Sequence, residues 1–143
     1  MTKDSCSTAL VLMVGLCFTA VACQHPDTGK ATAGAAIAQF HTRLDEERYA
    51  EIYAASHHRM KEAATEEGLS KTLQSVHIKL GKVKETVTES FNEGNYNLKG
   101  GVNVFQRTTF ERGKATERFV WAIDGQNAVL IGYRVDTMEL DKP

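Results

Sequence analysis

Apolar residues recur with helical spacing in the first half of the chain. Between about residues 35 and 46 they return every three or four positions, which is typical of a helix packed on a core. A second, shorter run with the same spacing covers about residues 49–60. The members of the first stripe are Ile37, Phe40, His41 and Leu44.

The third predicted helix has clear end signals. Thr65 is expected to be its N-cap, because Glu66 and Glu67 then place negative charge in the first turn, where the helix dipole favours it. Gly81 stands where a glycine in the left-handed conformation would end the helix. The apolar positions between these two ends are Leu69, Leu73, Val76 and Leu80.

After Gly81 the apolar period changes from helical spacing to two, which predicts strands. The first runs from Val83 towards Phe91, and three more are expected at about 102–110, 115–124 and 128–135. The short polar segments between the last three suit hairpin connections, so the pattern predicts a four-stranded antiparallel meander.

Helices followed by an antiparallel sheet define an α+β domain, with N-terminal helices packed on a curved sheet. Residues 119–123 and 128–131 are apolar on both faces, so we expect these strands to be covered on both sides. Helices can cover only one of those sides. The other is therefore a candidate contact surface.

The amino-terminal segment has the pattern of a signal peptide. An apolar run of 14 residues, from Ala9 to Ala22, follows a weakly basic start that Asp4 dilutes. It is too short to cross a membrane, which takes about 20 residues. Ala20-Val21-Ala22 before Cys23 resembles the lipobox of bacterial lipoproteins, although Leu is the usual residue where Ala20 stands.

Two interpretations of Cys23 remain open. It is either the acylated first residue of a mature lipoprotein or a free thiol after ordinary cleavage at Ala20-Val21-Ala22. We favour acylation, because cleavage removes Cys6 and Cys17 and leaves one cysteine without a disulfide partner. Gln24 after the cysteine then favours the outer membrane. The expected organisation is a leader (1–22), a flexible tether (23–34) and one domain (35–143).

Charge and composition restrict the class of partner. The net charge is −1 and the 143 residues contain no block dense in Lys and Arg. A phosphate backbone requires several clustered cations, so nucleic acid is not an expected partner. The length suits a single domain.

The order of elements and several short motifs resemble an uncharacterised family of small bacterial secreted proteins and lipoproteins. The family has the nuclear transport factor two-like, or cystatin-like, α+β roll, in which helices lie in the concave face of a bent sheet. The resemblance covers about residues 35–135 and implies a fold and no catalytic residues. The motifs are Leu80-Gly81-Lys82-Val83, Val104-Phe105, Thr108-Thr109-Phe110, Glu117-Arg118-Phe119 and Gly132-Tyr133.

No arrangement of titratable residues predicts catalysis or metal binding. His41 and His77 fall on faces directed at the sheet, and the adjacent His57 and His58 cannot readily hold one ion together. Acid/base chemistry needs a carboxylate or imidazole inside an apolar cavity, and none is evident. We expect Glu117 to be solvated or paired across strands. No cofactor is expected.

Aromatic residues are the candidates for binding. Trp121 and Tyr133 are placed on the sheet face that the helices leave open, together with Phe105, because such side chains bury area while keeping a polar group. Core packing is the competing interpretation for each of them.

The sequence supports two classes of function. The first is a non-enzymatic module of the cell envelope, anchored by lipid, which offers the open sheet face to a protein partner or a second copy; an immunity-type lipoprotein is a specific version. The second is a small-ligand binder or an isomerase-like enzyme that uses the cavity of the roll.

Overall fold

The computed structural model describes residues 28–94 and 100–142, so Cys23, the leader and residues 23–27 of the tether lie outside the described residues. Helices come first and strands follow, as predicted. The helices are α1 (Thr28–Asp45), α2 (Tyr49–Ala54), α3 (His58–Ala63) and α4 (Glu66–Leu80), and the strands are β1 (Val83–Glu93), β2 (Gly101–Phe110), β3 (Gly113–Asp124) and β4 (Asn127–Leu140).

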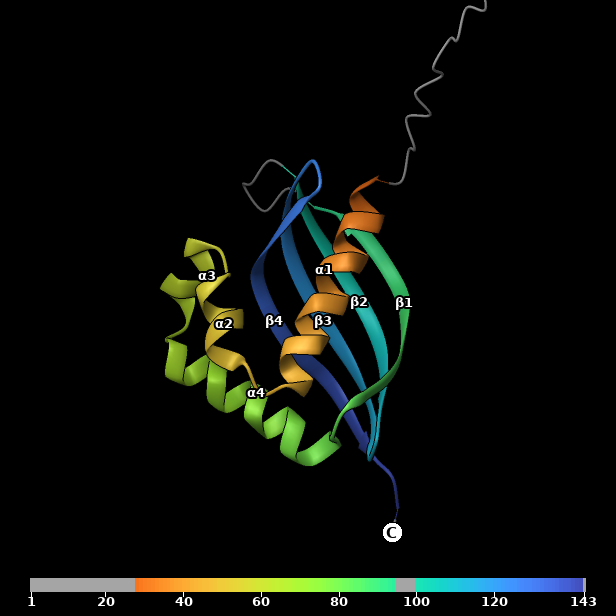
Figure 1. Cartoon of the computed structure of the whole chain (residues 1–143). Coiled ribbons are helices and arrows are strands. Elements are labelled where there is room, and N and C mark those ends of the chain that lie inside the picture. Colours follow the sequence, from red (N-terminus) through yellow and green to blue (C-terminus); the bar gives the residue numbers. More distant parts are fainter. Residues whose placement is uncertain (1–27, 95–99, 143) are drawn as a thin grey trace, which may run out of the picture.

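The strands form one antiparallel sheet in the order β1-β2-β3-β4, which confirms the predicted α+β class and the four-stranded meander. The sheet is curved, and α1 lies along one of its faces (Figure 1). The shorter helices α2 and α3 lie on the β4 side of the molecule, above α4 in this view.

The first helix begins earlier than predicted. α1 starts at Thr28, so residues 28–34, which were assigned to the flexible tether, are helical. The interpretation of this segment as a spacer is wrong because alanine, the best helix former, occupies 31, 33, 35 and 36. Ala33 is buried and extends the apolar stripe by one turn.

The second helical run is two short helices. His57 has extended backbone angles between α2 and α3, and its Nδ1 accepts a hydrogen bond from the Arg59 amide at 3.3 Å. The His57 amide in turn donates to the carbonyl of Leu130 in β4 at 2.8 Å. His57 thus caps α3 and attaches the link between the two helices to the sheet.

Both ends of α4 are held by specific contacts. The Thr65 hydroxyl accepts from the Gly68 amide at 3.1 Å, so the predicted N-cap is confirmed. Gly81 has a positive φ of 78° but a ψ of −155°, so it is not in the predicted left-handed helical conformation. This combination of φ and ψ is essentially restricted to glycine, which explains why glycine is needed here.

Two bulges set the direction of side chains in β4. Leu130 pairs with Trp121 and Gly132 with Val120, so Ile131 is the extra residue of the first bulge. The second falls between Val135 and Thr137 and leaves Asp136 extra. Because each bulge shifts the alternation by one, the inward positions of β4 are Ala128, Leu130, Tyr133, Val135 and Met138.

The core lies between the helices and the inward face of the sheet. From the sheet it contains alternate residues of β2 and β3, such as Val104 and Phe119, and from the helices the predicted apolar stripes. Every predicted stripe position of α1 and α4 is buried: Ile37, Phe40, His41, Leu44, Leu69, Leu73, Val76 and Leu80.

Candidate functional site

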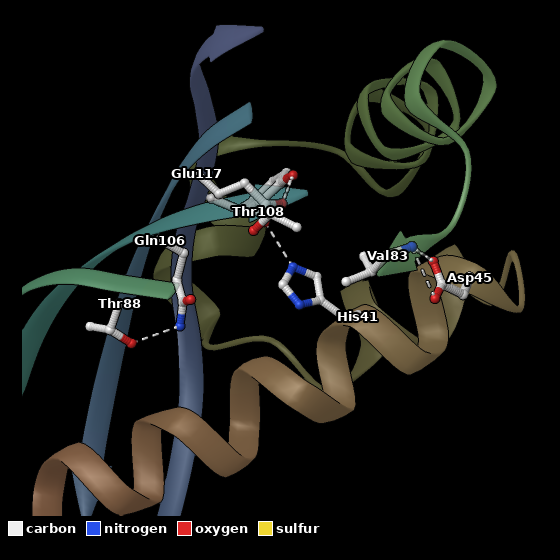
Figure 2. A network of polar contacts seen from close by, with 8 residues as sticks. His41, Asp45, Val83, Thr88, Gln106, Thr108 and Glu117 are labelled. Carbon is white, nitrogen blue, oxygen red and sulfur yellow. Dashed lines mark hydrogen bonds and ion pairs between the residues drawn. The ribbon is translucent and has the colours of Figure 1, made fainter. Parts of the chain in front are cut away.

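A cluster of four polar side chains lies inside this core. Its centre is the carboxylate of Glu117, whose residue is 0% exposed. Oε2 of Glu117 is 2.8 Å from His41 Nε2 and 2.5 Å from the Thr108 hydroxyl, which donates to it. The Tyr133 hydroxyl donates to Oε1 at 2.6 Å. Figure 2 shows His41 reaching from α1 towards the Glu117–Thr108 pair on the sheet.

Four different elements supply these groups. His41 belongs to the buried stripe of α1, Thr108 and Glu117 are inward positions of β2 and β3, and Tyr133 turns inward because of the first bulge in β4. The cluster forms only when helix and sheet are both in place. It therefore joins the two layers of the fold.

The surroundings hold Glu117 as a carboxylate. Burial opposes its ionisation and is the largest influence on its pKa. The hydrogen bond and charge of His41, with the hydroxyls of Thr108 and Tyr133, outweigh that influence and lower the pKa below 4.5. Burial and the adjacent Glu117 charge raise the pKa of Tyr133 well above 10.0, so its phenol stays protonated and keeps donating.

Aromatic rings enclose the cluster. Phe40 contacts Phe119 edge to face with ring centroids 5.1 Å apart, and Tyr133 lies 4.8 Å from Phe40 and 5.1 Å from Phe119. The His41 ring meets the edge of Phe119 at 5.8 Å. These rings exclude water and strengthen the interaction between the carboxylate and its donors.

Among the four polar side chains, Tyr133 lines a surface groove. This groove, of about 520 Å³, separates α4 from β4 and is also lined by Val76, Val135 and Met138. Any small molecule approaching Glu117 from the groove would meet the Tyr133 ring first. The carboxylate already accepts three hydrogen bonds from the protein, so a reactive role would require one of them to break.

The structure corrects two expectations about β3. Glu117 is not solvated or merely paired across strands; its position alternates with Ala115, Phe119 and Trp121, and all four point into the core. Trp121 does not lie on the open face, because it is 5% exposed and stacks at 6.0 Å on Phe119. Its buried Nε1 has no hydrogen-bond partner among the described residues.

Tyr133 is likewise turned to the helix side, so its predicted place on the open face is wrong. The expectation assumed unbroken alternation, and the bulge at Ile131 reverses it. Phe105 is the one predicted binding residue on the open face. It is half-buried and pairs across strands with Arg118, whose guanidinium lies 5.4 Å from its ring centroid.

Phe105, Arg118 and Asn103 form an ordered patch on the uncovered face of the sheet, which we call the outer patch. Arg118 Nε and Nη2 both donate to the Asn103 side-chain oxygen at 3.3 Å. Beside the patch, Val120 and Gly132 line a shallow depression of about 280 Å³.

Other candidates do not assemble into a site. His57 and His58 lie ring to ring at 4.1 Å, and His77 is 3.7 Å from Glu47 at the surface. Across residues 28–94 and 100–142, no group of three or more His, Cys, Asp or Glu side chains could hold a metal ion. In the same ranges, no helix is long and apolar enough to cross a membrane.

Sequence reasoning missed Glu117 as the centre of a polar cluster. The available signal was its inward register between apolar residues on a strand, which places a charge where only a paired charge is stable. His41 on an apolar helical stripe was the complementary signal.

Comparison of the chain with protein families, curated proteins and solved structures finds no match.

Proposed function

We propose that this protein is a non-enzymatic binding module of the bacterial cell envelope that recognises a protein partner through the uncovered face of its sheet. In this proposal the leader is removed and Cys23 carries the lipid anchor, on the periplasmic side of the outer membrane. The observation that supports partner binding is the outer patch around Phe105.

The outer patch has the composition of an interface centre. Arginine and aromatic residues are over-represented among residues whose truncation weakens protein complexes. Here Asn103 holds Arg118 over the Phe105 ring before any partner arrives. Less side-chain entropy is then lost on binding, which favours association.

The test is photocrosslinking in living cells. A photoreactive amino acid at Val120, beside the outer patch, should give an adduct with a partner protein, whereas the same group at Lys30 on the exposed side of α1 should not. The double variant Phe105→Ala/Arg118→Ala should remove the adduct. Equal crosslinking from Val120 and Lys30, or an adduct that survives the double variant, would contradict the proposal.

An adduct of twice the protein's mass would identify a second copy as the occupant, and a secreted toxin in the adduct would identify the immunity-type version. Identification of the crosslinked protein by mass spectrometry separates these outcomes.

The second candidate function is small-ligand binding or isomerase-like chemistry inside the roll. The buried His41–Glu117 pair favours it, because acid/base enzymes use such groups in water-excluded sites. Ligand screening by NMR discriminates the two functions. Shifts of the His41 and Tyr133 side-chain signals with a small molecule would support the second candidate, and His41→Gln should then weaken the response.

A further inference from the structure

A small pocket, which we call the α1–α2 pocket, lies on the helix side of the sheet where α1, α2 and β4 meet. Its volume is about 50 Å³. Three of the residues that line it carry the short side chain of alanine: Ala36 on α1, Ala55 directly after α2 and Ala128 on β4. One water needs about 10–15 Å³ of such a cavity, so the pocket has room for roughly four non-hydrogen atoms.

The polar side chains of the α1–α2 pocket are hydrogen-bond donors. Arg43 and Gln39 line it from α1, and Trp121 lines it from β3. The buried Nε1 of Trp121 donates to no described group. Among the described residues that line the pocket, none is acidic, and the others are apolar. A buried donor without an acceptor is rare in a folded protein, so a bound group that accepts hydrogen bonds would explain it.

The guanidinium of Arg43 is not occupied by the carboxylate nearest to it. Arg43 Nε is 4.0 Å from Glu51 Oε2, which is too far for a hydrogen bond. The same carboxylate already accepts two hydrogen bonds from Arg48, one from Nε to Oε1 and one from Nη2 to Oε2. Glu51 is therefore satisfied by Arg48, and Arg43 keeps donors for a ligand.

We infer that the α1–α2 pocket binds a short-chain carboxylate such as acetate or propionate. Its two oxygens accept from Arg43, whose planar guanidinium matches a carboxylate, and from the Trp121 indole. Its alkyl group packs against Phe40 and Leu130, which also line the pocket. A cavity with apolar walls and a few polar groups is typical of a small-molecule site. The pocket and the outer patch lie on opposite faces of the sheet, so this inference does not rest on partner binding.

The probe is sodium acetate, and the indole of Trp121 is the reporter. Trp121 is the one tryptophan of the chain, so its N–H gives a single indole signal in NMR spectra. Acetate should move this signal saturably at millimolar concentration, with sodium chloride holding the ionic strength constant. Acetamide, which has the same shape and no charge, should not. An equal response to acetamide, or no saturable shift up to about 100 mM acetate, would overturn the inference.

Three variants of the chain test the pocket itself. Arg43→Gln removes the charge and should weaken acetate binding at least about tenfold. Lys30→Gln, on an exposed position of the same helix outside the pocket, is the matched control and should bind acetate like the wild-type chain. Ala55→Leu enlarges an exposed residue of the lining and should also weaken binding. Trp121→Phe removes the indole N–H and should weaken binding as measured from the amide signals of residues 128–130.

Equal acetate affinity of the Arg43→Gln and Lys30→Gln variants would contradict the site, as would full affinity of Ala55→Leu. Urea denaturation verifies that each variant is folded. Phe105→Ala on the outer patch should leave acetate binding unchanged, and so should His41→Gln. Loss of binding in His41→Gln alone would assign the ligand to the buried cluster of Glu117 instead. Failure of this pocket is therefore distinguishable from failure of either proposed function.

Discussion

The imidazole Nε2 of His41 lies 2.8 Å from the carboxylate of Glu117, although 76 positions of sequence separate the two residues. One belongs to the first helix and the other to the third strand. The contact between the two side chains is therefore present only when the helical layer and the sheet are assembled.

Glu117→Gln should lower the free energy of unfolding by about 1–3 kcal/mol, because at least one of the buried groups that donate to the carboxylate is then left without a matching acceptor. Urea denaturation at neutral pH measures the change. Glu85→Gln, an exposed carboxylate on β1, is the control and should change stability by no more than about 0.5 kcal/mol. Equal effects of the two substitutions would show that the cluster does not stabilise the fold.

Glu117 should also make the free energy of unfolding depend on pH in the acid range. The pKa of Glu117 is lower in the folded protein than its ordinary value of 4.5, so the unfolded chain binds more protons in this range. The stabilisation is complete above pH 4.5 and is lost as the pH falls through the folded pKa. Denaturation at a series of pH values should therefore show a flatter acid dependence for Glu117→Gln than for the wild-type chain. Parallel curves would contradict the assignment.

Trp121 and Phe105 should respond differently to truncation. Trp121→Ala should cost about 3–5 kcal/mol of stability, since the indole is buried against Phe119. Phe105→Ala should cost much less, because the ring is partly exposed on the outer face. Trp121→Phe should cost less than Trp121→Ala, because it keeps a ring and removes the unpartnered N–H. Thermal denaturation of the three variants measures this order.

Arg112 is expected to stabilise the end of α4. Its guanidinium donates to the carbonyls of His77, Ile78 and Lys79 in the last turn of the helix, where most carbonyls lack an intrahelical donor. Arg112→Ala should therefore lower the unfolding free energy by about 1–2 kcal/mol. Arg107→Ala, an exposed arginine paired with Glu89, should cost no more than about 1 kcal/mol in the same denaturation assay.

Cys23 is expected to be the acylated amino terminus of the mature chain, with cleavage after Ala22. Mass spectrometry of protein purified from membranes should show a diacylglyceryl modification on Cys23. A Cys23→Ser variant should lose membrane association. An uncleaved leader or a free Cys23 thiol would contradict the lipoprotein interpretation.

Periodicity predicted the layers of the fold well because burial governs both helix stripes and strand alternation. It predicted the two buried stripes of α1 and α4 position by position, and the first three strands to within two residues at each end. It failed at β4, which continues to Leu140, because the bulge at Asp136 interrupts the alternation between Val135 and Met138.

The site was less predictable than the fold. The helical stripe placed His41 towards the sheet, but Glu117 was read as a surface residue because charge was given more weight than its register. Tyr133 was misplaced because a bulge leaves no signature in hydrophobic periodicity. Residues that meet across distant elements, such as His41 and Glu117, follow from tertiary packing and from no local pattern.

At the bulge of Ile131, β4 has one residue more than its pairing with β3 uses. Two residues, Ile131 and Gly132, stand opposite Val120 alone, so the strand can lose one of them and still present Tyr133 and Val135 to the core. A deletion at Val120 in β3 would not be absorbed in this way, because residues Gly113 to Ala122 of that strand are matched one for one with β2. A one-residue deletion is thus absorbed by the bulged edge strand but would shift the register of the central one, so β4 can change in length while Glu117 keeps its partners.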